Sequence, residues 1–481
     1  MISLQQAEKW LTGTVPVGDV SAPALRVVTD TRRLRAGDLF VVLKGERFDA
    51  HDFLGQAREL GAVGALAQHG LAAAGMPGLE VPDTRLALGE LAAGWRAQFS
   101  LPLIAVTGSN GKTTVTQMIA AVLRAWKRDA AFATEGNFNN DIGVPLTLLR
   151  LTAAHDVGVV ELGMNHPGEI AYLAQLVKPC VALINNAQRE HLEFMGTVDA
   201  VADENGAVLA SLPAEGTAVF PADDAYTARW RQLAGTRRML TFALQGDASN
   251  ACDADISGSA HWCAHHWQVV ASTPLGPLRF ALSVAGRHNV KNALAACACA
   301  LAAGAPLTAI AQGLSEFVPV TGRSRAATVF ANGRVVTVVD DTYNANPDSM
   351  QAAIEVLAQL PGPRLLVMGD MGEVGNDGPS FHHDAGRQAG LLQIDHLYTL
   401  GEQSAHAQRA FAAVRQQSLH HFSSMDALLE AVRKLLPDVN SVLVKGSRFM
   451  KMERVVRALE SMGHVDAGTA PPTSEETPHA A

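Results

Sequence analysis

A glycine-rich turn followed by a lysine and two threonines has the clearest chemistry in this sequence. Residues 101–114 read LPLIAVTGSNGKTT, and apolar residues recur at helical spacing after the turn. Backbone N–H groups at such a helix start point toward phosphate oxygens, the lysine adds a positive charge, and a threonine hydroxyl can ligate Mg²⁺. A plain helix cap is the alternative. The pattern predicts a nucleoside triphosphate site built from Gly108, Ser109, Asn110, Gly111, Lys112, Thr113 and Thr114.

Two further groups that could serve a metal follow later apolar runs. Glu161 ends the run VGVVE, and His191 lies in INNAQREHLEFMG, after another buried run. The carboxyl ends of parallel strands meet at one edge of a sheet, where ligands bind, so both side chains are expected near the triphosphate. Glu161 could instead be an exposed strand end. Histidine is an unusual Mg²⁺ ligand, so His191 could instead cap a loop.

Amide-rich segments provide further candidates for binding. Residues 134–143, TEGNFNNDIG, contain Asn139 and Asn140, although turn chemistry alone explains such a composition equally well. In GRHNVKNALAA, residues 286–296, the amide of Asn292 suits the edge of an adenine, and a helix cap is the alternative.

The last part of the chain holds a dense polar cluster. Asp341 ends a predicted strand and is followed by Asn344 and Asn346, while Arg323 lies in the turn VPVTGRS. Several such clusters at equivalent sheet edges favour a binding cleft over a set of solvated strand ends.

Around these groups the chain reads as α/β with three domains and a tail. Residues 1–98 form a small α/β domain, 99–317 a central phosphate-loop domain with a largely parallel sheet, and 318–462 a Rossmann-like domain without G-x-G-x-x-G. Residues 463–481 lack periodicity and are expected to be disordered.

Composition limits the class of protein. The 481 residues are 48% hydrophobic and 18% charged, which is typical of a globular chain. A formal net charge of −9 argues against a protein that binds nucleic acid through a broad basic face. The chain shows neither a signal-peptide pattern nor an apolar span of membrane length. We expect a cytoplasmic monomer that does not insert into membranes.

The motifs, taken in order, resemble those of the Mur ligases, ATP-dependent amide-forming enzymes of peptidoglycan synthesis. The resemblance spans nearly all of residues 1–461, and its DDTYNANP element is similar to the branch that adds D-alanyl-D-alanine. The matching segments are TGSNGKTT, NNDIGVPLTLL, ELGMNHPGEI, NNAQREHLE, GRHNVKNALAA, DDTYNANPDSM, GDMGEVG and LVKGSR.

This resemblance implies a role for each candidate residue. Lys112, Glu161 and His191 would be catalytic, with Thr113, Glu161 and His191 as Mg²⁺ ligands. Asn292 would read adenine, and Arg323 with Asp341 would hold the nucleotide. The implied substrate-binding residues are Thr31, Lys44, Arg47, His51, Asn139, Asn140, Asn344 and Asn346.

The reaction that the resemblance implies uses ATP and Mg²⁺ to join D-alanyl-D-alanine to UDP-N-acetylmuramoyl-tripeptide through an acyl phosphate. Alternatives are the branch that adds a diamino acid, for which we find no D-N-P-R-like segment, and folylpolyglutamate synthase, whose phosphate loop lies nearer the N-terminus. Earlier Mur ligases carry a Rossmann-like first domain, which this N-terminal block does not suggest. A nucleotide-binding scaffold without activity is a further alternative.

One position departs from the family pattern. A lysine that the family usually carries in an A-K-G-E-like segment, and that serves the second metal as a carbamate, is replaced here by Asn205 in VADENGAV. Glu204 is adjacent, but its side chain leaves a helix in another direction. We hypothesise that Glu204, Asn205 or a water fills this place while activity persists.

Overall fold

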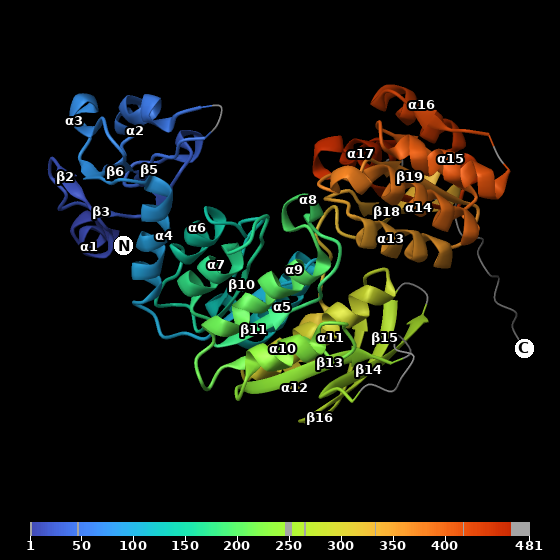
Figure 1. Ribbon diagram of the computed structural model, residues 1–481, viewed down its shortest axis with the longest axis horizontal. Helices are drawn as coiled ribbons and strands as arrows, with labels where there is room; N and C mark the ends of the chain where they lie inside the picture. The colour runs from blue at the N-terminus through green and yellow to red at the C-terminus, as the bar shows by residue number, and fades with distance from the viewer. Residues whose placement is uncertain are drawn as a thin grey trace, which may run out of the picture. The chain divides into compact units, whose positions relative to one another are not determined.

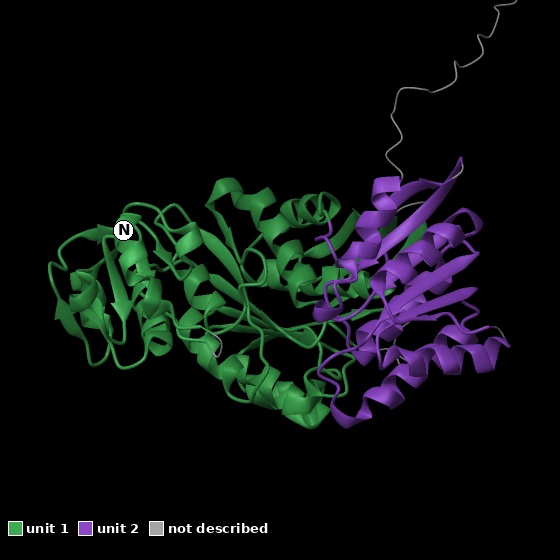
Figure 2. Cartoon of the chain, turned by 90° about the horizontal axis from the view of Figure 1, so that it is seen from above, with its two compact units in different colours: residues 1–283, 287–318 green, residues 284–286, 319–481 purple. Residues whose placement is uncertain are grey.

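The computed structural model of the protein describes residues 2–45, 48–245, 253–263, 266–331, 333–416 and 418–462. The chain divides into two compact units, residues 1–283 with 287–318 and residues 284–286 with 319 onward, coloured separately in Figure 2. Arg47 and the predicted tail from residue 463 lie outside the described residues. Among the described helices, none combines the length and apolar character needed to cross a membrane.

The main sheet of the first unit positions the phosphate loop. Its described strands, in spatial order, are β16 (Gly276–Leu282), β15 (His266–Thr273), β14 (Ile256–Cys263), β13 (Arg238–Leu244), β12 (Thr217–Pro221), β11 (Val181–Ile184), β8 (Leu103–Thr107), β10 (Val157–Glu161) and β9 (Ala131–Ala133). All neighbouring pairs from β9 to β14 are parallel, whereas β15 runs antiparallel to both of its neighbours, β14 and β16 (Figure 1). The predicted largely parallel sheet is therefore confirmed.

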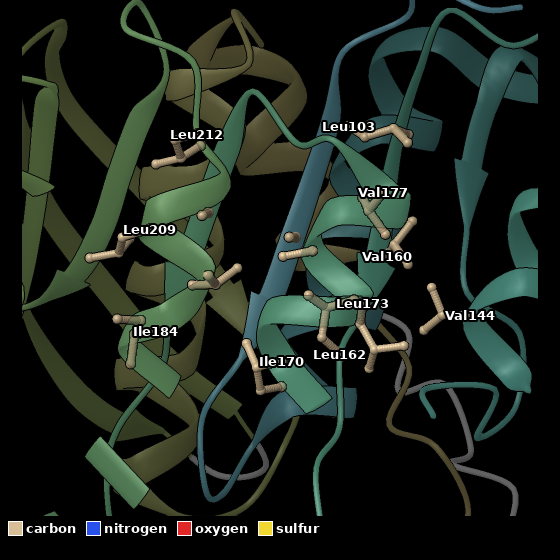
Figure 3. Packing of buried hydrophobic residues seen from close by; sticks show 14 of the residues in the cluster. Leu103, Val144, Val160, Leu162, Ile170, Leu173, Val177, Ile184, Leu209 and Leu212 are labelled. Carbon is tan, nitrogen blue, oxygen red and sulfur yellow. The ribbon is translucent and has the colours of Figure 1, made fainter. Parts of the chain in front are cut away.

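The central strands of this sheet are apolar on both faces, and helices cover each face. On one face, Leu103 of β8 and Val160 of β10 lie in one hydrophobic cluster with Leu173 and Val177 of α7 (Glu169–Val177), and Figure 3 shows Val160 close to Val177. Alternate residues such as Ile104 point to the other face, where α5 (Lys112–Lys127) and α11 (Arg287–Ala302) pack against each other. The remaining longer helices of this region are α9 (Val198–Gly206), α10 (Thr227–Ala234) and α12 (Leu307–Ser315), with short α6 (Gly143–Leu148) and α8 (Leu192–Met195).

The N-terminal part of the first unit is a small α/β fold, as predicted. Its five-stranded sheet has the order β2 (Val15–Val17), β7 (Gly78–Glu80), β6 (Gly64–Ala67), β5 (Leu39–Val41) and β4 (Val27–Val28), and β1 (Ile2–Ser3) pairs with β3 (Pro23–Ala24). The helices are α1 (Leu4–Trp10), α2 (Leu54–Glu59), α3 (Leu71–Ala74) and α4 (Thr84–Arg96).

The second unit contains a six-stranded sheet of Rossmann-like type. Its order is β17 (Arg325–Ala331), β18 (Arg334–Asp341), β22 (Ser441–Lys445), β19 (Arg364–Gly369), β20 (His396–Leu400) and β21 (His421–Phe422). The helices are α13 (Pro347–Gln359), α14 (Gly378–Leu391), α15 (Ser404–Arg415), α16 (Met425–Leu435) and α17 (Glu453–Met462). The antiparallel strand β17 was not predicted. The boundaries at 98, 317 and 462 stay predictions.

A buried arginine joins α4 to the main sheet of the first unit. Arg96 donates to the carbonyls of Val177 at 2.9 Å, Phe99 at 2.5 Å and Leu101 at 3.2 Å. Burial lowers the pKa of this guanidinium. The same group therefore closes the last turn of α7 and holds the segment that leads into β8.

We predict that Arg96→Met lowers the free energy of unfolding of the first unit by roughly 2–4 kcal/mol, because it leaves buried carbonyls without a donor. Arg85→Met is the matched control, since Arg85 lies on the same helix and its pairing with Asp141 is solvent-exposed. The control should change stability by less than about 1 kcal/mol. Calorimetric melting of both variants measures the difference, and equal losses would contradict this role of Arg96.

Candidate active site

The phosphate loop connects β8 to α5 through two glycines in backbone conformations that other residues rarely adopt. Gly108 has φ 131° and Gly111 has φ 81°. A Cβ on Gly111 would lie 2.7 Å from Asn185 Nδ2 and 2.8 Å from Asn292 Oδ1, so there is no room for a side chain. Gly111 is also the N-cap of α5 and provides no side-chain cap. The N–H groups of the first turn, which includes Thr113 and Thr114, are therefore oriented for an anion.

The strands next to β8 bring further polar groups to this loop. Glu161 of β10 lies opposite Val106, and Ile184 of β11 lies opposite Thr107. Because these strands are parallel, Glu161 and the segment that follows Ile184 reach the same edge as the phosphate loop. The order of the strands therefore brings Lys112, Glu161 and the loop carrying His191 to one edge of the sheet, as the sequence predicts.

Glu161 forms a small oxygen-rich cluster with Thr113. The Thr113 hydroxyl donates to Glu161 Oε1 at 2.9 Å, and Asn139 Nδ2 donates to the same oxygen at 2.8 Å. Glu161 is 1% exposed, and within the described part of the chain its Oε2 has no hydrogen-bond partner. A buried carboxylate oxygen without a donor beside a threonine hydroxyl fits Mg²⁺, which prefers oxygen ligands. Asn139, expected on the substrate side, contacts this cluster.

Lys112 is held by its own loop and by a residue after β11. Its Nζ donates to the carbonyls of Gly108 at 2.6 Å and Ser109 at 3.2 Å, and to Glu190 Oε1 at 2.5 Å. Glu190 is buried, and burial raises the pKa of its carboxyl while the Lys112 ammonium opposes that rise. His191 Nε2 lies 3.7 Å from the same carboxylate oxygen. His191 is among the residues predicted from the sequence, whereas Glu190 is not.

A second loop, residues 185–188, is bonded to the phosphate loop through amides. The N–H groups of Ser109 and Asn110 donate to the backbone oxygen and Oδ1 of Asn186, at 3.1 Å and 2.8 Å. Gln188 accepts from Asn110 Nδ2 at 2.7 Å and donates its N–H to Ser109 Oγ at 2.8 Å. These amides were not singled out from the sequence, although their run directly after a buried strand could have indicated them.

Asn292 lies beside the phosphate loop in a buried chain of amides. Its Oδ1 accepts from Asn185 Nδ2 at 3.0 Å, and its own Nδ2 donates to Asn289 Oδ1 at 3.0 Å. The structure thus places Asn292 against Gly111. Its role in reading adenine stays a prediction.

Helix α9 does not offer a metal ligand at the position where the family carries lysine. Asn205 is fully buried, accepts from Thr107 Oγ1 at 2.6 Å and donates to Val201 O at 3.0 Å. Both carboxylate oxygens of Glu204 accept backbone N–H groups at the start of α7, from Gly168 at 2.8 Å and Ile170 at 2.7 Å. These residues do not fit a carbamate-bridged second metal, and the contacts of Glu204 give no support to its proposed substitution for lysine.

Two of the predicted residues of the N-terminal part, Lys44 and His51, lie next to Asp49. Lys44 Nζ lies 3.5 Å from Asp49 Oδ2, and His51 Nδ1 lies 2.5 Å from Asp49 Oδ1. His51 Nε2 accepts from the N–H of Gln68 at 3.1 Å, so the ring is fixed from both sides. This pairing holds the pKa of Asp49 at about 2. Thr31 begins a short 3₁₀ turn elsewhere in this part.

In the second unit, charged residues meet at the carboxyl end of β18. Asp341 accepts from Lys445 Nζ at 2.6 Å and from the N–H of Ser324 at 2.9 Å. The guanidinium of Arg323 lies over the ring of Tyr343, 3.9 Å from its centre. The Lys445 ammonium also donates to the carbonyl of Asn344 at 2.8 Å.

Two of the predicted binding amides accept backbone N–H groups at the starts of helices. Asn140 Oδ1 accepts from the N–H of Gly143, at 2.8 Å, at the start of α6. Asn346 is the N-cap of α13 and accepts from the N–H of Ser349 at 2.8 Å. Both side chains therefore have structural contacts, and their substrate roles stay predictions.

Comparison with known families agrees with this arrangement along the whole chain. Residues 26–96 match the model of the Mur ligase family catalytic domain, 106–300 that of the Mur ligase middle domain, and 324–448 that of the Mur ligase glutamate ligase domain. The chain belongs to the Mur ligase family. Its α/β architecture and phosphate loop are those of this family of ligases.

Several similar proteins carry the name of one branch of the Mur ligases. The chain is 42% identical over 465 residues to the UDP-N-acetylmuramoyl-tripeptide–D-alanyl-D-alanine ligase of Escherichia coli, covering 96% of this chain and 99% of that protein. A crystal structure of MurF from Acinetobacter baumannii superposes with a TM-score of 0.85 at 36% identity, covering 95% and 98% of the two chains. MurF from Thermotoga maritima, solved with ADP, gives 0.78 at 26% identity, covering 91% and 97%.

We predict that Gly111→Ala weakens ADP binding by about tenfold or more, which corresponds to about 1.4 kcal/mol. Gly168→Ala is the matched control, because Gly168 is also a left-handed helix N-cap, with φ 92°, but a Cβ there meets nothing within 4 Å. Both variants bear the strain of a left-handed alanine, roughly 1–2 kcal/mol. Calorimetric titration with ADP separates them, and retained affinity in Gly111→Ala would show that the loop tolerates a side chain.

Proposed function

We propose that this Mur ligase joins D-alanyl-D-alanine to UDP-N-acetylmuramoyl-tripeptide with cleavage of ATP to ADP and phosphate, in the cytoplasm. The observation that carries the proposal is the end-to-end similarity, at 42% identity, to an enzyme named for this reaction. The phosphate loop with Lys112, Thr113 and Glu161 at one sheet edge supports the ATP-dependent step.

The chemistry follows from the reactants. The terminal carboxylate of the tripeptide attacks the γ-phosphorus of ATP and gives an acyl phosphate and ADP. The dipeptide amine then attacks the acyl carbon, a tetrahedral intermediate forms, and phosphate leaves with one oxygen of the original carboxylate. Since a carboxylate and a triphosphate repel each other, the protein must mainly neutralise charge and align the reactants.

The residues of the phosphate loop have separate tasks in this proposal. The N–H groups at the start of α5 and the Lys112 ammonium bind the β- and γ-phosphates. Thr113 and Glu161 would hold Mg²⁺, which supplies charge neutralisation at the phosphates. Asn139 orients Glu161 through its 2.8 Å hydrogen bond. His191 remains the proposed additional metal ligand.

The other predicted residues have weaker support and are proposed as binding groups. Lys44 and His51, joined through Asp49, would face the UDP-sugar together with Thr31 and Arg47. Arg323 and Asp341 would hold the nucleotide from the second unit. Asn140, Asn344 and Asn346 complete the proposed substrate-binding set.

We predict that phosphate release requires ATP, UDP-N-acetylmuramoyl-tripeptide and D-alanyl-D-alanine together. The UDP-linked dipeptide precursor and a diamino acid, supplied in place of the UDP-tripeptide and D-alanyl-D-alanine, should give only background phosphate release. This combination tests for the branch that adds a diamino acid. A coupled phosphate assay with this substrate panel measures both. Nucleotide binding without turnover on the full set would instead support an inactive scaffold.

We also predict that a tripeptide carboxylate labelled with heavy oxygen delivers one labelled oxygen to the released phosphate, because the acyl–oxygen bond breaks in the second step. Mass spectrometry of the phosphate detects the label. Unlabelled phosphate from an active enzyme would exclude the acyl phosphate.

Lys112→Met should reduce turnover on the order of 100-fold, as expected for loss of one group that stabilises transition-state charge.

A further inference from the structure

All three N–H donors of the Lys112 ammonium have acceptors within the protein. An ammonium group carries three protons, and Nζ lies within hydrogen-bond distance of three oxygens, on Gly108, Ser109 and Glu190. Two of these are carbonyls of the phosphate loop itself. Glu190 comes from a separate segment, after β11, so it is the partner that a nucleotide can replace without disturbing the loop.

Both side chains of the Glu190–Lys112 ion pair are largely buried. The Glu190 side chain is 9% exposed and that of Lys112 13%, and their ion pair is 2.5 Å long. Within the described residues, the second oxygen of Glu190 has no hydrogen-bond partner. A buried carboxylate needs a nearby cation, and here Lys112 provides it.

A phosphate that reaches Lys112 meets this carboxylate at the same ammonium. The two anions repel each other, and the repulsion is strong because the site is largely shielded from water. Phosphate and Glu190 therefore compete for one positive charge. Phosphate can use the Lys112 ammonium only in the fraction of molecules in which Glu190 has left it. The apparent affinity for the nucleotide is reduced by that fraction.

We propose that Glu190 is a positioning residue that competes with the terminal phosphate of the nucleotide for Lys112. It keeps the lysine ordered in the empty site, and it returns to the lysine as the diphosphate product leaves. This inference rests on the phosphate loop as the nucleotide site of the proposed function, but not on the identity of the peptide or amine substrates.

Metal-free binding of ADP and adenosine to the full-length protein tests the proposal. In Glu190→Gln, the Kd for ADP should fall about fivefold or more, within the usual range of coupling between two sites. Dissociation of ADP should slow accordingly. Adenosine has no phosphate, so its affinity should not change. Measurements in EDTA exclude any contribution from Mg²⁺.

Glu193→Gln is the matched control, because Glu193 is exposed and lies three residues further along the chain, in α8. Its affinities for ADP and adenosine should equal those of the unmodified protein. Glu190→Asp, which keeps the charge but has a shorter reach, should shift the ADP affinity in the same direction as Glu190→Gln. It serves as the second variant if thermal melting shows that the glutamine variant folds poorly.

Unchanged or weaker ADP binding in both Glu190 variants would overturn the proposal and leave the pair as a purely structural contact. An equal shift for ADP and adenosine would also overturn it, because the change would then not act through phosphate. Since neither probe involves peptide or dipeptide, these results stand apart from any failure of the ligase assay.

Discussion

The position of β8 between two parallel neighbours is the constraint on which the phosphate site depends. β10 and β11 pair with β8 in registers that place Glu161 opposite Val106 and Ile184 opposite Thr107. Three chain segments therefore end at one edge, and each continues into a loop there. A shift of one residue in either register would turn the polar end of that strand toward the opposite face.

Neutral amides contribute several of the hydrogen bonds that fix the shape of this edge. Asn186 and Gln188 bond to the phosphate loop, and Asn185 links the loop to Asn292, since its Nδ2 donates both to the backbone oxygen of Asn110 and to Asn292 Oδ1. An amide both donates and accepts, so it satisfies buried backbone groups without adding charge. The same reasoning applies to Asn205, whose amide holds the hydroxyl of Thr107 at the end of β8.

Local patterns explain what the sequence could predict. Lys112 and Thr113 follow a turn whose geometry is determined by adjacent residues. Glu161 lies at the carboxyl end of a parallel strand, where ligands bind. All three residues could therefore be predicted as site residues without knowledge of distant contacts. The antiparallel β17 was missed, although Asn332 and Gly333 form a typical hairpin signal between two β-rich runs. Edge strands that are half exposed have a weaker apolar pattern than buried ones.

Residues whose roles depend on distant partners could not be assigned in this way. Glu190 meets Lys112 across 78 positions, and Glu204 reaches the start of α7 across 34 to 36 positions. Acidic residues at such places are common on protein surfaces, so only the folded chain distinguishes them. The side chains of Asn140 and Asn346 bond to backbone N–H groups only three positions away, at the starts of α6 and α13, so these contacts are local.

The charges buried at this edge bear on the proposed role of a divalent cation. Glu161 and Glu190 are both buried carboxylates, and the Lys112 ammonium bonds only to Glu190, while Glu161 accepts from the neutral groups of Thr113 and Asn139. If Glu190 and a phosphate compete for that ammonium, a triphosphate would enter a region with excess negative charge. Mg²⁺ beside Glu161 Oε2 would reverse this balance, since it adds two positive charges at an oxygen that has no donor. Metal and lysine would then neutralise different anions, which explains why both belong to one phosphate site.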